Sequence, residues 1–244
     1  MRENTTPSPE YSIVVLCYGS GELIRDFVEA TIGVLLENDI RDYQLVLVGN
    51  YLESCTDRTP EIVKEFEKEN PRILSVVKKK DGMMGWDMRA GLAAATGKYI
   101  SVIDGDGQMP VEDLVKVYKK IKNENYDLVK TVRIKREDGT WRTIISGVFN
   151  ILLRLLFPAV RSKDVNSKPK IVTRANYERL DLKSNDWFID AEIMIQAGRL
   201  GFKVAEVPTY FNAPTRNSDS FITFFTILEF IKNLVRFRFT EYWK

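Results

Sequence analysis

The chain has 244 residues, of which 44% are hydrophobic, and a formal net charge of +2. This length is enough for one sizeable core and short for two independent ones. The sequence contains no histidine, which excludes histidine-based triads, histidine acid–base catalysis and histidine-ligated zinc. Carboxylates, arginines and a bound metal are left to carry any chemistry.

The first ten residues, MRENTTPSPE, are polar and have no periodicity. They predict a disordered lead-in over residues 1–10 rather than a signal segment. The two cysteines, Cys17 and Cys55, do not suggest a disulfide framework. We therefore expect a reducing, cytoplasmic location.

Short β-branched runs alternate with helical patterns through the first two-thirds of the chain. This alternation is typical of βαβ units and predicts an α/β fold with a mixed, mainly parallel sheet. The expected strands are residues 12–17, 44–48, 73–77, 99–103 and 128–134, and the expected helices are residues 23–37, 60–69, 86–95 and 110–123.

The regular alternation of short strands and helices ends after residue 136. We expect helices at residues 141–157, 190–200 and 221–239, and strands at residues 171–173 and 203–207. The first and last of these helices are apolar on nearly all sides, with a thin polar stripe. Polar and charged residues interrupt both, so neither is expected to span a bilayer. They are expected to lie amphipathically in a membrane interface, and packing on the sheet or on a second subunit is the alternative.

Basic residues concentrate in one part of the chain. Residues 130–174 contain eleven Lys and Arg against three acidic residues. Because very apolar stretches interleave with them, this block suggests anionic lipid or phosphate nearby. An ordinary solvated face is the alternative.

The sequence SVIDGDGQMP, residues 101–110, carries the strongest chemical signal. A β-branched strand ends in Asp104-Gly-Asp106, which places two carboxylates at the carboxyl edge of a parallel sheet, where ligands of open α/β folds bind. Oxygen ligands at this spacing suit Mg²⁺ or Mn²⁺ together with substrate phosphates. A plain Asp-Gly turn is the alternative.

Residues 104–114, DGDGQMPVEDL, resemble the Asp-Ala-Asp-Leu-Gln-x-Pro-Pro-Glu segment of family 2 glycosyltransferases, particularly the polyprenyl-phosphate (dolichyl-phosphate) mannosyl and glucosyl synthases. The resemblance runs from residue 11 to residue 216. It is also carried by residues 81–99, Arg133, Trp141-Arg142 with Ser146 and Asn150, residues 164–170, Asp190-Ala-Glu192, and residues 201–208.

Three segments depart from the family pattern. The first strand usually ends Pro-Thr-Tyr-Asn-Glu, and here it reads Leu16-Cys17-Tyr18-Gly19-Ser-Gly-Glu22, which keeps only the tyrosine and the glutamate. The second strand normally ends with acids, the first of which recognises the nucleotide base, and here it reads Val48-Gly49-Asn50-Tyr51. The Arg-x-x-Gly-x-Ser-Lys element appears only as Arg216-Asn-Ser-Asp-Ser220-Phe221, without its lysine. The sequence therefore leaves open whether the base is uracil or guanine.

The resemblance implies a GT-A, Rossmann-like domain over residues 11–212. Its nucleotide-binding half covers residues 11–110 and its acceptor half residues 111–212, followed by a C-terminal loop and amphipathic helix over residues 213–244. Helices are expected on both faces of the sheet.

The resemblance also implies site residues in three groups. The catalytic residues are expected among Asp104, Asp106, Gln108, Asp190 and Glu192, with Asp106 and Asp104 as the metal ligands. The residues expected to bind the donor are Tyr18, Gly19, Glu22, Asn50, Asp57, Gly85, Asp104, Gly105 and Asp106. The residues expected to bind phosphate or the acceptor are Arg133, Arg142, Ser146 and Arg216. Asp190 and Glu192 lie two apart on one expected helix, roughly 160° around its axis, so they cannot both face one ligand.

The implied activity is an inverting transfer of a sugar from a nucleoside diphosphate, GDP-mannose or a UDP-sugar, to a polyprenyl or dolichyl phosphate, with Mg²⁺ or Mn²⁺. The enzyme would be peripheral on the cytoplasmic face of a membrane, with a membrane-protein partner or a second copy as further partners and no nucleic acid. One alternative is a family 2 enzyme acting on a sugar hydroxyl in glycan or polysaccharide synthesis, where Asp190 or Glu192 becomes an essential base. Another is a non-catalytic GT-A domain that binds nucleotide or a partner.

Overall fold

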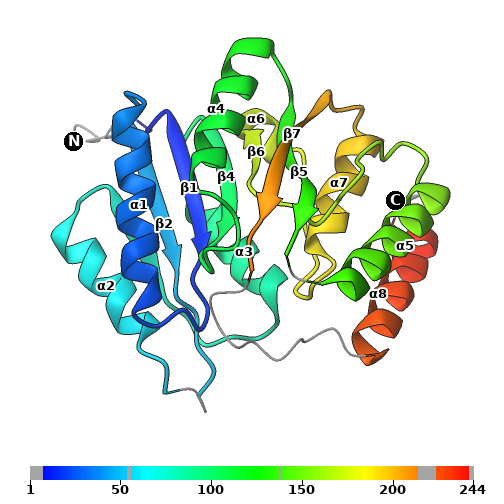
Figure 1. The fold of residues 1–244 in the computed structure, drawn as a ribbon, viewed down its shortest axis with the longest axis horizontal. Helices are drawn as coiled ribbons and strands as arrows, with labels where there is room; N and C mark the ends of the chain where they lie inside the picture. The colour runs from blue at the N-terminus through cyan, green and yellow to red at the C-terminus, as the bar shows by residue number, and fades with distance from the viewer. Residues whose placement is uncertain (1–7, 54–55, 138, 214–223, 242–244) are drawn as a thin grey trace, which may run out of the picture.

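One mixed sheet runs through the centre of the molecule (Figure 1). The computed structural model describes residues 8–53, 56–137, 139–213 and 224–241. Within these residues the sheet has seven strands in the order β3-β2-β1-β4-β6-β5-β7. They are β1 (Tyr11–Leu16), β2 (Tyr43–Val48), β3 (Ile73–Val76), β4 (Tyr99–Asp104), β5 (Leu128–Arg136), β6 (Lys170–Thr173) and β7 (Val204–Phe211).

The strand directions bring distant residues to one edge of the sheet. Strands β1 to β4 are mutually parallel, whereas β6 runs antiparallel to both of its neighbours, β4 and β5. The start of β6 therefore lies beside the end of β4, where Lys170 pairs with Val102. Asp104, at the end of β4, pairs with Leu16 at the end of β1. Functional groups from β1, β4 and β6 consequently meet at this edge.

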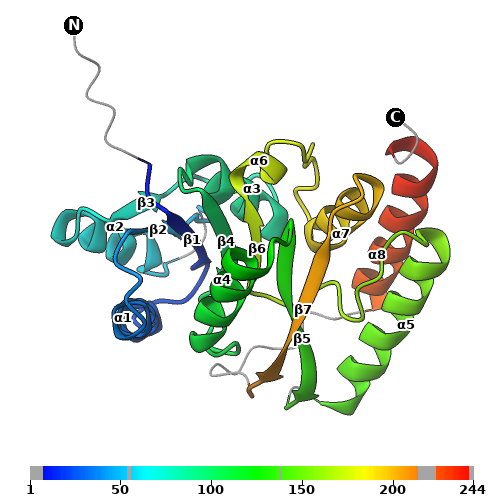
Figure 2. The ribbon, with the colours of Figure 1, turned by 90° about the horizontal axis from the view of Figure 1, so that it is seen from above.

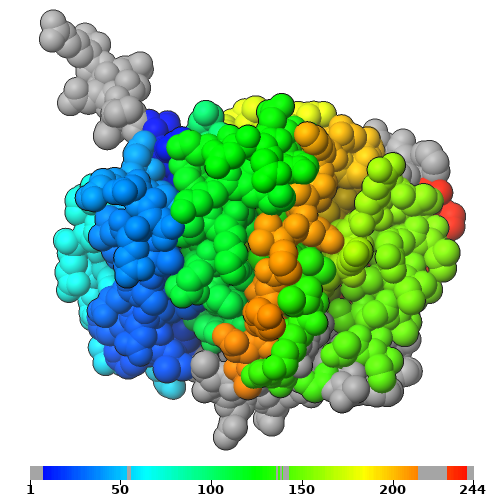
Figure 3. All heavy atoms as spheres, turned by 45° about the horizontal axis from the view of Figure 1, so that its top comes forward, coloured from blue at the N-terminus to red at the C-terminus, as the bar shows by residue number. Residues whose placement is uncertain are grey.

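Helices cover both faces of the sheet, as Figure 2 shows from above. On β1, Ile13 and Val15 pack with α1, α2 and α4, whereas Val14 and Leu16 pack with α3, α5 and α7. The helices are α1 (Leu23–Glu37), α2 (Thr59–Glu69), α3 (Met84–Ala94), α4 (Glu112–Glu124), α5 (Thr140–Leu156), α6 (Arg174–Tyr177), α7 (Ile189–Arg199), α8 (Phe224–Arg236) and the π-helix η1 (Phe237–Glu241). Figure 3 shows the face that α1 and α4 fill, with β7 at the surface beside α4.

The expected α/β fold, with a mainly parallel sheet and helices on both faces, is confirmed. The largest strand difference is at β7, which continues to Phe211 instead of ending at residue 207. Pro208 lies inside this strand, opposite Val132 of β5. The edge position of β7 explains why a proline is accepted there. A strand that is paired on one side alone can accommodate a residue without an N–H group.

Helices α5 and α8 lie side by side at one end of the molecule (Figures 1 and 2). The rings of Phe149 and Phe230 join them, with centroids 5.2 Å apart. Residues 221–223 of the expected last helix are outside the described residues. No helix in the part of the chain that the structure describes has both the length and the apolarity that a membrane crossing requires.

Helix α3 lies unusually close to the sheet, and Gly91 makes this possible. A Cβ atom on Gly91 would stand 2.4 Å from Val14 Cγ1 and 2.7 Å from Val48 Cγ2.

We predict that Gly91→Ala lowers the free energy of unfolding by about 1–3 kcal/mol, because helix α3 and the sheet must separate. Gly33→Ala in α1 is the control, since its Cβ would meet nothing within 4 Å, and it should raise stability by up to about 1 kcal/mol. Urea denaturation measures both, and equal effects would contradict the packing argument.

Candidate active site

The acidic turn after β4 depends on its two glycines. Gly105 donates its N–H to Leu16 O at 2.9 Å, and a Cβ there would stand 2.9 Å from Ile24 Cδ1. Gly107 has φ of +73°, a conformation that favours glycine. The turn is thereby held against β1, and the carboxylates of Asp104 and Asp106 lie at the carboxyl edge of the sheet.

The two carboxylates of this turn influence each other. Loss of solvation, and then the charge of Asp104, raise the pKa of Asp106 to about 6. The backbone N–H of Gln108 opposes the shift by donating to Asp106 Oδ1 at 3.0 Å. Asp106 as a whole is exposed to solvent. Two repelling carboxylates are a site that a cation would stabilise.

A buried ammonium stands beside this turn. Lys168 Nζ lies 3.0 Å from Asp104 Oδ2 and 3.1 Å from Asp190 Oδ2, and it contacts Met84 Sδ at 3.4 Å. Burial alone would lower the pKa of Lys168, but the two carboxylates raise it above its ordinary value. Lys168 is therefore a permanent positive charge that joins β4 to α7.

Asp190 and Glu192 face different surroundings, as their spacing on α7 predicts. Asp190 Oδ1 lies 2.5 Å from Lys170 Nζ while its Oδ2 faces Lys168. Glu192 is fully buried and accepts hydrogen bonds from Lys183 N at 3.0 Å and from Ser184 N at 2.9 Å. Of the two acids, only Asp190 is brought to the acidic turn.

The ends of β1 and β2 carry a second polar cluster. Asn50 Nδ2 donates to Asp87 Oδ1 at 2.8 Å, and Asp87 also pairs with Lys80. The Lys80 ammonium lies 3.9 Å from the centroid of the Tyr18 ring. Asn50 Oδ1 accepts from Lys78 N at 2.8 Å. Asn50 is thus buried in an internal hydrogen-bond network, whereas Tyr18 is exposed at its rim.

The other expected donor-binding residues surround this edge. Gly19 has φ of +66° in the loop after β1. Glu22 pairs with Arg25 at 2.9 Å and Arg58 at 3.0 Å. Asp57 Oδ1 accepts from Thr59 N at 3.0 Å just before α2.

Gly85 has a packing role of its own. A Cβ there would stand 2.4 Å from Ser184 O and 2.6 Å from Asp186 O. Its N–H donates to Asp186 O at 3.0 Å. The first turn of α3 therefore lies directly on the segment that precedes α7.

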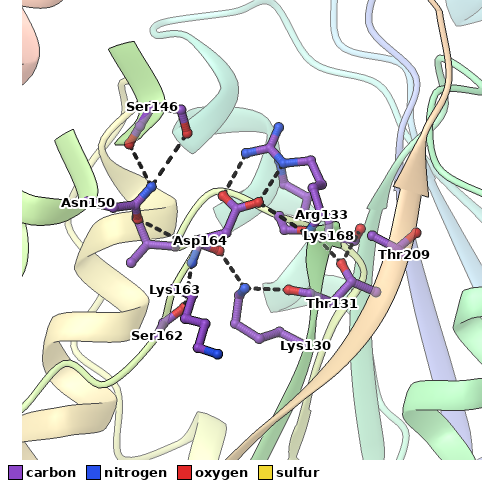
Figure 4. Close-up of polar contacts among 12 residues, drawn as sticks. Lys130, Thr131, Arg133, Ser146, Asn150, Ser162, Lys163, Asp164, Lys168 and Thr209 are labelled. Atoms are coloured by element: carbon purple, nitrogen blue, oxygen red, sulfur yellow. Dashed lines mark hydrogen bonds and ion pairs between the residues drawn. The ribbon is translucent and has the colours of Figure 1, made fainter. Parts of the chain in front are cut away.

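Arg133 lies in a buried ion pair, which Figure 4 shows. Its Nε and Nη2 atoms stand 2.6 and 2.7 Å from the two carboxylate oxygens of Asp164. Burial would raise the pKa of Asp164, but the guanidinium of Arg133 holds it at about 2.

A buried lysine lies close to this pair. Lys130 Nζ donates to the carbonyl oxygens of Thr131 and Asp164, both at 2.5 Å. Burial, and then the charge of Lys170, lower the pKa of Lys130 to about 7.

The remaining expected acceptor residues are placed as follows. Ser146 O and Oγ in α5 accept from Asn150 Nδ2 at 2.7 and 3.4 Å (Figure 4). Arg142 belongs to α5, but its side chain is outside the described part. Arg216 also lies outside the described residues. Gln108 Nε2 donates to Asn212 O at 3.2 Å, next to the end of β7.

The basic block of residues 130–174 is partly internal. Lys130, Lys168 and Lys170 are buried, and the Arg133 side chain is 9% exposed. Each of them faces an acidic partner. The excess of positive charge therefore does not form one solvated surface, because at least these four groups lie inside the molecule and face acidic side chains.

Sequence reasoning missed Lys168, Lys170, Lys80 and Asp87 as members of the candidate site. The one available signal was in residues 164–170, which read Asp-Val-Asn-Ser-Lys-Pro-Lys where the family that the sequence resembles usually has Asp-x-x-Ser-Gly-Phe-Lys, so that Lys168 stands in place of glycine. Lysine is almost never buried without a partner, but the partner, Asp104, is 64 residues away.

The donor set of the acidic turn fits a divalent cation. Among the described residues, no group of three or more His, Cys, Asp or Glu side chains could hold a metal ion. Asp104 and Asp106 are two hard oxygen donors on one turn, which suits Mg²⁺ or Mn²⁺ when substrate phosphates supply further ligands. Loss of solvation is the main cause of the raised pKa of Asp106, and the charge of Asp104, which such a cation would offset, adds to it.

The fold agrees with solved glycosyltransferase structures of the GT-A type. Glucosyl-3-phosphoglycerate synthase from Mycobacterium tuberculosis, in complex with Mn²⁺, UDP-glucose and phosphoglyceric acid, matches with a TM-score of 0.66 and 18% identity over 94% of this chain and 79% of that one. Mannosyltransferase PcManGT from Pyrobaculum calidifontis, in complex with GDP-Man and Mn²⁺, matches with a TM-score of 0.60 and 19% identity. This match covers 87% of the present chain and 59% of PcManGT. At these identities the likeness shows the fold alone.

The family model "Glycosyl transferase family 2" matches residues 12–178, so the chain belongs to this family. Glycosyltransferase AglD of Haloferax volcanii is 28% identical over 210 residues, 84% of this chain and 33% of that protein. Dolichyl-phosphate beta-glucosyltransferase ALG5A of Trichomonas vaginalis is 25% identical over 214 residues, 82% of this chain and 65% of that protein. The chain thus spans less than two-thirds of the length of these two relatives.

The Arg133–Asp164 pair makes stability depend on pH. The folded pKa of Asp164, about 2, lies below its ordinary value of 3.8. Its contribution is therefore complete above about pH 4 and is lost as the pH falls toward 2, amounting to about 2 kcal/mol.

We predict that Asp164→Asn lowers the free energy of unfolding at pH 7 by about 3–5 kcal/mol, because Arg133 is left buried without its carboxylate. The difference from wild type should shrink between pH 4 and pH 2. Denaturant titrations across this range measure it, and a constant difference would contradict the assignment.

Proposed function

We propose that the protein is an inverting, metal-assisted enzyme that moves a sugar from a nucleoside diphosphate to a polyprenyl or dolichyl phosphate at a membrane surface. The observation that carries this choice of acceptor is the environment of Asp190. Both of its carboxylate oxygens face ammonium groups, Lys170 at 2.5 Å and Lys168 at 3.1 Å. These two charges, working against burial, lower the pKa of Asp190.

An acid held in this way is a poor general base, since the proton it would take is disfavoured by two neighbouring positive charges. Glu192 is engaged on the other side of α7. A hydroxyl acceptor needs a base, whereas a phosphate monoester is mostly ionised near neutral pH. The arrangement therefore favours an acceptor that is already an oxyanion.

We assign the donor to the edge formed by β1, β2 and β4. Asp104 and Asp106 would hold Mg²⁺ or Mn²⁺, which when bound neutralises the charge that grows on the departing nucleoside diphosphate. Tyr18, at the exposed rim, is assigned to the base and ribose, together with the neighbouring Gly19 and Glu22. Gln108 is assigned to orientation of the diphosphate. The acceptor phosphate oxygen attacks the anomeric carbon from the face opposite the leaving group, so the configuration inverts.

The work of this site is positioning and charge stabilisation rather than proton transfer. Arg142 and Arg216 are proposed to bind the acceptor phosphate, because a guanidinium binds phosphate oxygens bidentately and keeps its charge. Arg133 is proposed to contribute through its pair with Asp164, which joins β5 to the segment before β6.

We assign the membrane contact to the outer faces of α5 and α8. Exposed apolar side chains follow helical spacing on both: Ile144, Val148, Ile151 and Leu155 on α5, and Ile231, Val235 and Phe239 on α8 and η1. Arg154 and Lys232, also exposed, lie on the same pair of helices. An apolar face with basic residues at its rim is the composition of a helix that lies in the membrane interface. This surface is where the lipid phosphate would arrive.

We predict that radiolabelled sugar from a panel of UDP- and GDP-sugars enters solvent-extractable lipid when the protein, Mg²⁺ or Mn²⁺ and a polyprenyl phosphate are present. Asp106→Ala should reduce the rate by at least about 100-fold, because transition-state charge loses its main support. Label on a glycan instead would establish a hydroxyl acceptor. Binding of donor without turnover would leave a non-catalytic nucleotide-binding domain.

A second prediction concerns the membrane surface. Paired substitution of Val148 and Leu155 by Asp should abolish co-flotation with vesicles of mixed neutral and anionic phospholipid, since charge enters the apolar face. Leu36→Asp is the control, because Leu36 is also exposed but belongs to α1, which lies away from α5 and α8 (Figure 1). Unchanged flotation of the double variant would exclude this face as the membrane contact.

A further inference from the structure

The buried ammonium of Lys168 occupies one carboxylate of the acidic turn. We propose that Lys168 is a counter-cation that keeps the affinity of this turn for divalent metal low until a diphosphate binds, so that metal and donor bind cooperatively. The proposal rests on the proposed metal site at Asp104 and Asp106. It adds a role for a side chain that belongs to no assigned group of site residues.

The contacts show that Lys168 is fixed in place. Its side chain is 3% exposed, and its Nζ atom lies 3.0 Å from Asp104 Oδ2, 3.1 Å from Asp190 Oδ2 and 3.4 Å from Met84 Sδ. These three partners come from β4, α7 and α3. An ammonium held by three elements cannot swing into solvent as a surface lysine does, so Asp104 keeps a positive neighbour at all times.

The charge of the site determines how strongly it holds a cation. The affinity of carboxylate sites for divalent ions rises with the number of charged ligands. In the acidic turn, one negative charge of the two is already offset by Lys168 across 3.0 Å. A divalent ion that approaches Asp104 is therefore repelled by the ammonium of Lys168. The net charge of Asp104, Asp106 and Lys168 together equals that of one carboxylate.

A nucleoside diphosphate changes this balance. Its phosphates add negative charge and oxygen ligands beside the turn, which compensates for Lys168 and completes the coordination of the metal. Each ligand then raises the affinity of the other by the same factor, as linkage requires.

Lys170 offers a matched control. It is buried like Lys168 and comes from the same segment, and its Nζ atom contacts Asp190 Oδ1 at 2.5 Å and Ser167 O at 2.9 Å. No contact between Lys170 and Asp104 is present among the described residues, so removal of its charge changes the surroundings of Asp190 and leaves the ion pair of Asp104 intact.

The test is the binding of Mn²⁺ to the whole chain, followed by electron paramagnetic resonance of the free ion, with and without UDP or GDP. Wild type should bind Mn²⁺ at least about 10-fold more tightly when the effective nucleotide is present. Lys168→Met should bind Mn²⁺ about 10-fold more tightly than wild type without nucleotide, and the enhancement by nucleotide should shrink. Lys170→Met should change the Mn²⁺ affinity much less than Lys168→Met does, because its Nζ atom contacts Asp190 Oδ1 at 2.5 Å.

Two results separate this inference from the proposed function. If Asp106→Ala does not weaken Mn²⁺ binding, the metal site itself is wrong. If Asp106→Ala weakens it while Lys168→Met leaves the affinity unchanged, the metal site stands and the inference on Lys168 is overturned.

Thermal unfolding of each variant checks that it folds. Lys168→Gln, which keeps hydrogen-bonding capacity without the charge, serves if the methionine variant does not fold. If neither variant folds, the wild type alone decides, because an enhancement of Mn²⁺ binding by nucleotide of less than about 3-fold contradicts the proposed coupling.

Discussion

The alternating row of charges Asp104, Lys168, Asp190 and Lys170 is the interaction on which the rest of the site depends. It links the end of β4 to the first turn of α7 and to the start of β6 through contacts of 2.5 to 3.1 Å. Charges this deep in a protein are tolerated when each has a partner, and removal of one leaves the next uncompensated. The row therefore fixes the end of β4 against α7 and the start of β6.

Pairing with acidic side chains also reduces the positive charge that the basic segment, residues 130–174, presents to solvent. In the linear sequence, residues 130–174 have a strong excess of positive charge. In the fold, Arg133 binds Asp164 inside the molecule, and Lys130 lies near Glu206 at 3.7 Å. The electrostatic attraction to a phosphate or lipid surface is then carried by fewer groups than the count suggests. The apolar side chains of α5 and α8 become the larger part of the proposed membrane contact.

The fold was predictable from the sequence because its signals are local. Alternating β-branched runs and helical periods define the βαβ units, and the Asp-Gly-Asp turn is contiguous, so Asp104 and Asp106 were identified together. The opposed directions of Asp190 and Glu192 followed from helical geometry alone. The roles of Lys168 and Arg133 depend instead on β6, an antiparallel strand of four residues inserted between β4 and β5. Its register pairs residues far apart in the chain, and no local pattern encodes those partners.

Gln108 and Asn212 are joined by two hydrogen bonds, Gln108 Nε2 to Asn212 O at 3.2 Å and Asn212 N to Gln108 O at 2.9 Å. The acidic turn is thereby fastened to the residue that follows β7. A sequence change that moves the end of β7 would therefore displace Gln108 and Asp106 together, although neither of these residues is itself changed.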